Sequence, residues 1–141
     1  MADWWTSPAT AEDGKLIMVT GRRHVKTFRE NPRFRIRGEV SWKYKSGADG
    51  MPGLEDSRQM EEVQELLCAE FDRDPVAVLT GVYTGDGERN WVFYTLSTHI
   101  FGKKLNAALE SLPVLPLEIY AENDPDWAEY DEMWECEINL D

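Results

Sequence analysis

The sequence predicts an α+β fold, in which a mainly antiparallel sheet of about five strands packs two helices on one face and carries a short C-terminal helix. Three patterns indicate it. Apolar and polar side chains alternate over residues 33–45, as in a strand with one buried face. Residues 60–71 and 101–112 repeat apolar side chains at helical spacing. Residues 76–96 hold two apolar runs joined by Gly85-Asp86-Gly87, which is typical of a hairpin.

Length and composition favour a single domain over residues 1–141. The chain has 141 residues, of which 42% are hydrophobic, enough for one continuous core, and no linker rich in proline, glycine or serine divides it. The N-terminus has no basic and apolar leader, and the longest aliphatic run, residues 16–19, is too short to span a membrane. The two cysteines, Cys68 and Cys136, do not form a disulfide framework. We therefore expect a soluble cytoplasmic domain.

The first 45 residues contain the signals of two or three strands. Asp13-Gly14 is a predicted turn between a segment around Trp4-Trp5 and a strand that begins near Lys15. Asn31-Pro32 marks a second turn before the 33–45 strand. The predicted buried face of that strand comprises Phe34, Ile36, Val40, Trp42 and Tyr44. The predicted solvent-facing side comprises Arg33, Arg35, Arg37, Glu39, Ser41 and Lys43.

A helix is predicted from Asp56 to Asp72, after a glycine-rich loop over residues 46–53. Asp56 or Ser57 can cap its N-terminus. The loop lacks the glycine patterns of phosphate-binding loops, which favours a plain connection over a ligand-binding loop. The apolar stripe of the helix is formed by Met60, Val63, Leu67 and Phe71.

The predicted hairpin over residues 76–96 is apolar on both faces. A turn centred on Asp86 predicts the pairs Val82–Asn90, Thr80–Val92 and Val78–Tyr94 on one face, and Tyr83–Arg89, Gly81–Trp91 and Leu79–Phe93 on the other. Such a strand is covered on both faces, or it exposes a patch that binds something. We expect an end segment, either Trp4-Trp5 or the C-terminal aromatic helix, to cover Trp91 and Phe93.

The remaining residues predict a second helix, a short strand and a third helix. Ser97 or Thr98 can cap the second helix, and Pro113 stops it. Its stripe is formed by Phe101, Leu105, Ala108 and Leu112. Residues 117–121 alternate as a short strand. Asp124-Pro125 then has the pattern of an N-cap and first helical residue, and the helix that follows places Trp127, Tyr130 and Trp134 on one side.

The order of the strands leaves two arrangements open. In a ferredoxin-like or closely related sheet, the strand at 115–122 lies beside the strand at 33–45. A strand near 15–28 competes for that place as a hairpin partner across Asn31-Pro32. Because short connections usually join neighbouring strands, the hairpin is slightly favoured.

Charge is distributed unevenly along the chain. The formal net charge is -12, yet ten of the 15 basic residues lie within residues 15–45, where only Glu30 and Glu39 oppose them. Residues 118–141 contain ten acidic residues and no basic one. Overall acidity disfavours nucleic-acid binding, which needs cations to neutralise phosphates. We expect the two segments to be neighbours in the fold and to neutralise each other in part.

Three segments resemble a known family. They are Gly50-Met51-Pro52 before an acidic helix, the hairpin TGDGERNWVFYT and the closing DPDWAEY. Together they resemble the bacterial domain of unknown function 695, over roughly Trp4 to Trp134. The resemblance implies a family without an agreed activity or catalytic residues, so none is transferred. The arginine-rich stretch over residues 22–37 departs from the aliphatic strands that the family implies.

No catalytic, cofactor or metal residue is predicted. His24 and His99 lack a second ligand at metal-binding spacing. Asp124 and Asp126 have the spacing of a helix cap and first turn, where the helix dipole favours acids. The acidic run over residues 122–137 has two interpretations, a solvated face or a docking surface for a basic partner.

The leading hypothesis is a non-enzymatic binding or regulatory module that docks a protein partner through its acidic C-terminal surface. The predicted partner-binding residues are Glu129, Asp131, Glu132 and Glu135. The alternative is single-stranded RNA binding on an aromatic sheet face of Tyr83, Trp91 and Phe93, flanked by Arg35 and Arg37. We expect no cofactor, no membrane partner, and a monomer or small homo-oligomer. An enzyme would require a deep pocket with convergent titratable groups.

Overall fold

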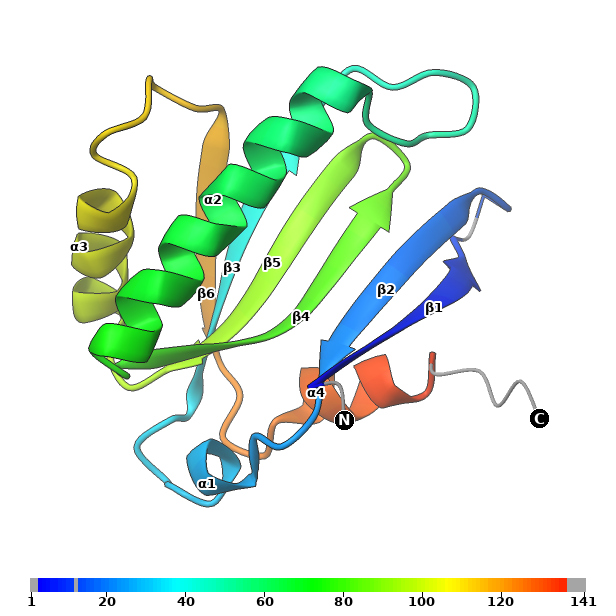
Figure 1. The fold of residues 1–141 in the computed structure, drawn as a ribbon. Coiled ribbons are helices and arrows are strands. Elements are labelled where there is room, and N and C mark those ends of the chain that lie inside the picture. The colour runs from blue at the N-terminus through cyan, green and yellow to red at the C-terminus, as the bar shows by residue number, and fades with distance from the viewer. Residues whose placement is uncertain (1–2, 12, 137–141) are drawn as a thin grey trace.

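The computed structural model describes residues 3–11 and 13–136 as an α+β fold with a six-stranded antiparallel sheet and four helices (Figure 1). In chain order the elements are β1 (Trp4–Thr10), β2 (Leu16–Arg22), α1 (Lys26–Arg29), β3 (Ile36–Lys43), α2 (Leu54–Arg73), β4 (Ala77–Gly85), β5 (Glu88–Thr95), α3 (Thr98–Ala108), β6 (Leu117–Asn123) and α4 (Ala128–Trp134). The sheet is larger than the predicted one of about five strands, because both N-terminal segments pair as strands. The acidic residues Glu137 and Asp141 lie outside the described residues.

The strand order is β1-β2-β4-β5-β3-β6, and every neighbouring pair is antiparallel. β6 lies beside β3, whereas β2 pairs with β1 and β4. The hairpin predicted between the N-terminal strand and β3 across Asn31-Pro32 is therefore wrong. Residues 23–35 instead carry the chain past one end of the sheet through α1 (Figure 1). Val25 and Phe34 are buried on this path, which holds the long connection in place.

The β4–β5 hairpin turns at Asp86 and Gly87. Their φ angles of 51° and 82° are of the kind that two-residue hairpin turns require. The observed pairs include Val82–Trp91, Gly81–Val92 and Leu79–Phe93. The first two differ by one residue from the predicted register, because the turn is tighter than predicted. An irregularity at Thr80 then restores the predicted register toward the start of β4.

Both faces of the sheet are covered, as the doubly apolar hairpin predicts. α2 and α3 cover one face, while α4 and α1 pack on the other (Figure 1). The first core includes Val40, Trp42, Met60, Val63, Leu67, Phe71, Leu79, Trp91, Phe93, Phe101 and Leu105. The second core includes Trp5, Val19, Phe34, Val78, Val92, Tyr94, Trp127, Tyr130 and Met133. The hairpin therefore supplies side chains to two separate cores.

The register of β3 is confirmed, but its predicted length is wrong. Trp42 is 3% exposed and lies in the first core, as the alternation requires. Phe34, which the same alternation assigns to that core, lies in the second core instead. The reason is that β3 begins only at Ile36, itself half-buried, so the alternation of a strand does not apply to Phe34.

The cover over the hairpin agrees with the prediction only in part. Trp91 and Phe93 are buried in the first core under α2 and α3, and Trp4 of the N-terminal segment packs against the same core. α4, which was a candidate for that role, instead packs on the opposite face against Val92 and Tyr94. Each face of the hairpin thus has its own helical layer.

The two long helices match the predicted stripes better than the predicted ends. α2 begins at Leu54 with Gly53 as its N-cap, so the predicted cap at Asp56 or Ser57 is wrong. All four residues of its predicted stripe are buried. α3 is capped by Ser97, whose hydroxyl accepts the N–H of Ile100 at 3.2 Å, as predicted. The helix ends at Ala108 and not at the predicted Leu112, because the N–H groups of Glu110 and Leu112 donate to carbonyl oxygens three residues back, which forms tighter turns than an α-helix.

The glycine-rich loop over residues 46–53 packs against the hairpin turn. The carbonyl oxygen of Gly50 accepts the N–H of Gly87 at 3.0 Å and the hydroxyl of Tyr44 at 2.7 Å. Gly50 has a φ of 76°, and a Cβ at this position would lie 2.9 Å from the backbone nitrogen of Asp86. Glycine is therefore needed for this close backbone contact, which supports the interpretation of the loop as a connection.

Leu67→Ala is expected to lower the free energy of unfolding by about 2–5 kcal/mol, because truncating a fully buried leucine leaves a cavity. Leu54→Ala is the matched control, since Leu54 lies on the same helix but is 89% exposed. Urea denaturation of both variants measures the difference. Equal stability of the two variants would contradict the assignment of the core.

Candidate functional site

The segment that carries the predicted partner-binding acids is attached to the sheet by Asp124, which is 7% exposed. Its Oδ1 accepts the N–H of Ala128 at 2.9 Å. Its Oδ2 accepts the N–H of Glu129 at 3.2 Å and the hydroxyl of Tyr94 at 2.6 Å. α4 begins at Ala128 and not at Pro125 as predicted, yet Asp124 still satisfies its first N–H groups.

Opposing effects act on the carboxyl of Asp124. Burial alone would raise its pKa, but the hydrogen bonds from Tyr94 and two backbone N–H groups, together with the charge of Arg37, lower it. Burial, and then the neighbouring carboxylate, raise the pKa of Tyr94. Asp124 is therefore ionised and Tyr94 neutral near pH 7. The pair acts as a structural anchor.

Trp127 fixes the turn before α4. It has a left-handed backbone conformation with a φ of 57° and is 1% exposed. Its indole N–H donates to the carbonyl oxygen of Phe34 at 2.7 Å, and its ring stacks on Tyr94 with 4.1 Å between the centroids. Asp126, the other aspartate of the segment, is exposed. The sequence Asp124-Pro125-Asp126-Trp127 thus docks the chain on itself, and its two aspartates have different surroundings.

Two of the four predicted partner-binding acids are engaged within the chain. Glu129 is half-buried, and its Oε1 accepts the hydroxyl of Tyr83 at 2.7 Å. Burial raises the pKa of Glu129 despite this hydrogen bond. Asp131 receives two hydrogen bonds from Arg29, both 2.7 Å long, and they lower the pKa of its carboxyl. Removing either acid would therefore disturb the packing of α4.

The other two acids face solvent. Glu132 and Glu135 are exposed, and neither has an ion-pair partner among residues 3–11 and 13–136. Glu132 lies in the last turn of α4 and Glu135 is its C-cap, while the buried side of the helix includes Tyr130 and Met133. The helix therefore presents two carboxylates outward from a fixed base.

The basic and acidic segments are neighbours in the fold, as predicted. Arg37 lies 2.7 Å from Glu39, 3.3 Å from Glu122 and 3.4 Å from Asp124. The pair formed by Arg29 adds a second link, between α1 and α4. These ion pairs between the basic and acidic segments thus contribute to the packing of β6 and α4 against the basic segment.

A polar network that the sequence did not predict lies on the α4 side of the sheet. Asn90 Nδ2 donates to Glu39 Oε1 at 2.8 Å, and Ser41 Oγ donates to Asn90 Oδ1 at 3.0 Å. Arg37 Nε completes it by donating to Glu39 at 2.7 Å. The sequence indicates only that Arg37, Glu39 and Ser41 lie on one face of their strand. That Asn90 joins them depends on the register between β3 and β5, which the sequence does not show. Because these groups pair with one another, the network holds the two strands in register.

The aromatic residues of the RNA hypothesis do not form one surface. Trp91 and Phe93 are fully buried under α2 and α3, and the indole N–H of Trp91 donates to Gln64 Oε1 at 3.0 Å. Tyr83 lies on the opposite face, beside Glu129. The rings of Trp91 and Phe93 are therefore unavailable for base stacking in this structure.

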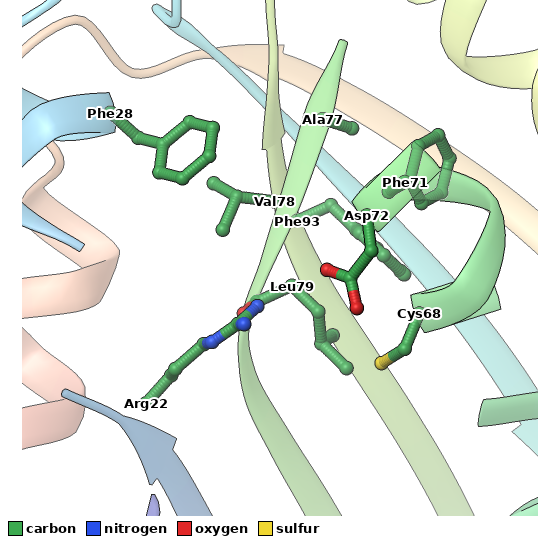
Figure 2. A pocket seen from close by; sticks show the side chains of 9 residues that line it. All are labelled: Arg22, Phe28, Cys68, Phe71, Asp72, Ala77, Val78, Leu79 and Phe93. Atoms are coloured by element: carbon green, nitrogen blue, oxygen red, sulfur yellow. The ribbon is translucent and has the colours of Figure 1, made fainter. Parts of the chain in front are cut away.

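A small cavity lies between α2 and the start of β4, and Figure 2 shows its lining. Its polar lining is Arg22, Cys68 and Asp72, and Arg22 donates to the carbonyl oxygen of Leu79 at 3.3 Å. The cavity volume of about 60 Å³ is far below the roughly 300–1,000 Å³ of small-molecule sites. Burial raises the pKa of the Cys68 thiol, so the reactive thiolate is scarce at neutral pH.

The histidines lie apart on the surface. His24 precedes α1 and His99 lies in the first turn of α3, and both are exposed. In the described part of the chain, no group of three or more His, Cys, Asp or Glu side chains is arranged to hold a metal ion. No helix of that part is long and apolar enough to cross a membrane.

Comparison with protein families gives one match. Residues 3–134 match the model described as Family of unknown function (DUF695). The chain belongs to this family. The resemblance seen in the hairpin and in DPDWAEY is thereby confirmed, and both segments have a structural role here. No curated protein and no solved structure matches the chain.

Asp124→Asn is expected to lower the free energy of unfolding by about 1.5–3 kcal/mol at neutral pH, because the ionised carboxylate accepts three hydrogen bonds. A carboxyl whose pKa is lowered on folding stabilises the protein fully above its unfolded pKa. This contribution is lost as the pH falls through the folded pKa. The difference from wild type should therefore be constant above about pH 5 and shrink below about pH 4.

Urea unfolding at a series of pH values measures this difference. Asp126→Asn, at an exposed aspartate of the same turn, is the matched control and should change little. A difference between Asp124→Asn and wild type that grows toward low pH would contradict the proposed anchor.

The ion pair of Arg29 and Asp131 is expected to contribute about 0–1 kcal/mol, because both side chains are partly exposed, by 36% and 57%. A double-mutant cycle with Arg29→Gln and Asp131→Asn isolates the coupling energy. The coupling should decrease as salt is raised toward about 1 M. Coupling that is unaffected by salt would show that packing, and not charge, joins the two residues.

Proposed function

We propose that the protein is a non-enzymatic binding or regulatory module that docks a basic protein partner through the acidic surface of α4. The observation that supports this is the exposure of Glu132 and Glu135 on a helix fixed by Asp124 and Trp127. Neither acid has a counter-ion within the described residues. Carboxylates held in fixed positions favour lysine and arginine side chains of a partner.

The net charge of -12 supports the same kind of partner. A strongly acidic protein attracts basic surfaces over distances set by the ionic strength, which accelerates encounter. Salt should therefore affect the association rate more than the dissociation rate.

The non-enzymatic part of the proposal is supported by two features of the described residues. The polar network on the α4 side pairs its groups with one another. The cavity of Figure 2, about 60 Å³ in volume, is too small for an organic substrate, and the larger groove of about 320 Å³ beside β6 is lined mostly by apolar side chains.

We also propose that the unit from β3 to β6 is ferredoxin-like. Its strand order β4-β5-β3-β6, with α2 and α3 on one face, supports this classification. A cytoplasmic location is part of the proposal, and the two unpaired cysteines, Cys68 and Cys136, support it.

Glu132→Gln/Glu135→Gln is expected to abolish partner capture and leave the melting temperature nearly unchanged. Glu62→Gln/Glu65→Gln is the matched control, because it removes two exposed charges at the same spacing from α2. Affinity capture from the native host, with and without RNase, followed by quantitative mass spectrometry, compares the variants.

Arg33→Gln/Arg35→Gln tests the nucleic-acid alternative, because both arginines are exposed. The proposal predicts that a partner is captured by this variant, by wild type and by the α2 control, whether or not RNase is present. Equal loss of partner capture in the Glu132→Gln/Glu135→Gln and Glu62→Gln/Glu65→Gln variants would indicate non-specific attraction. Loss only with the arginine variant or with RNase would overturn the proposal in favour of nucleic-acid binding.

A further inference from the structure

We propose that the outer edge of β6 binds an extended peptide segment, whose residues alternate between apolar and basic, as an added strand of the sheet. This site is separate from the acids of α4 and does not depend on them. In strand addition, backbone hydrogen bonds provide affinity and alternate side chains provide specificity.

The first supporting feature is the free edge of β6, which pairs with β3 alone among the described strands. Alternate residues of an antiparallel strand direct their N–H and C=O groups to the same side. Because the N–H of Asp124 donates to the carbonyl oxygen of Arg35 at 2.7 Å, the groups of Ile119 and Ala121 point away from β3. β1, at the other edge of the sheet, is interrupted by Pro8, whereas β6 contains no proline.

The second feature is a groove of about 320 Å³ beside this edge, on the α3 side of the sheet, lined mostly by apolar side chains together with Asn106 and Glu110. Its apolar lining is Leu105, Leu109, Leu112, Leu115, Leu117 and Ile119. Ile119 is 45% exposed, and Val114 at the groove is fully exposed. Side chains of an added strand that face α3 would enter this groove and remove apolar surface from water.

The third feature is the acidic character of the opposite face of β6. Glu118, Tyr120 and Glu122 alternate with the apolar residues, and all three are exposed. Glu118 has no ion-pair partner in the described ranges, and Glu122 shares Arg37 with two other carboxylates. Basic side chains on this face of an added strand would lie beside the two glutamates and the ring of Tyr120.

These features together specify the occupant. One face of the added strand must be apolar to fill the groove, and the other must be basic to match the glutamates. A second copy of the chain fits less well, because pairing β6 with itself would gather Glu118 and Glu122 of both copies on one face. The expected occupant is therefore a basic and apolar segment of another protein.

The test uses a synthetic peptide of about nine residues that alternates lysine and valine, titrated into the isotope-labelled full chain and followed by NMR. Chemical shift changes should concentrate at Ile119 and Ala121, and the amides of both residues should exchange more slowly with solvent. A peptide with the same composition, but with its lysines and valines in two blocks, should bind about tenfold more weakly.

Charge reversal tests the specificity. Glu118→Lys should weaken binding of the lysine–valine peptide about tenfold and should strengthen binding of a glutamate–valine peptide. Glu62→Lys on α2 is the matched control and should leave both affinities nearly unchanged. Glu132→Gln/Glu135→Gln should also bind the peptide normally, which separates this site from the proposed surface of α4.

Three results would overturn the proposal. They are shift changes confined to α4 or α2, equal binding of the alternating and block peptides, and self-association through β6 in the absence of peptide.

Discussion

The need to cover both faces of the β4–β5 hairpin governs the rest of the structure. Val78, Val92 and Tyr94 face one side, Leu79, Trp91 and Phe93 face the other, and all six are nearly completely buried. Each large apolar side chain contributes about 1.5–3 kcal/mol when buried. With only one helical layer, the side chains on the other face of the hairpin would stay exposed and would not contribute this stabilisation. α4 provides part of the second layer through Tyr130 and Met133, although a helix of 7 residues is not stable alone. Its position depends on Asp124, on the stacking of Trp127, and on Gly81, where a Cβ would overlap the sulfur of Met133.

Local patterns predicted much of the fold. The stripe of α2 and the buried Trp42 follow from periodicity, because each pattern lies within one element. The position of β2 beside β4 could not be predicted, since it depends on pairing between residues far apart in the chain. The irregularity at Thr80 and the left-handed Trp127 also have no periodic signature. Phe34 was assigned to the wrong core because a period of two holds only inside a strand.

The candidate sites were predictable only in part. The acidic C-terminal segment was visible as composition, but only the structure separates Glu129 and Asp131, which bind Tyr83 and Arg29, from the outward Glu132 and Glu135. The edge of β6 required the strand order, because a short alternating sequence does not reveal whether it lies at an edge or in the centre. The two proposed surfaces lie on different elements: β6 is at one edge of the sheet, beside β3, and α4 packs over β2 and β4. The anchor at Asp124 lies between them in the chain.

Native-state hydrogen exchange at Ala128 and Glu129 tests the central claim most directly, because their N–H groups donate to Asp124. If α4 is an integral layer of the fold, these amides should exchange with the same free energy and denaturant dependence as the buried strand amides of Trp91 and Phe93. Exchange through a local opening that costs several kcal/mol less, and does not depend on denaturant, would contradict the claim. α4 would then be a loosely attached segment, and the second face of the hairpin would open to solvent without unfolding.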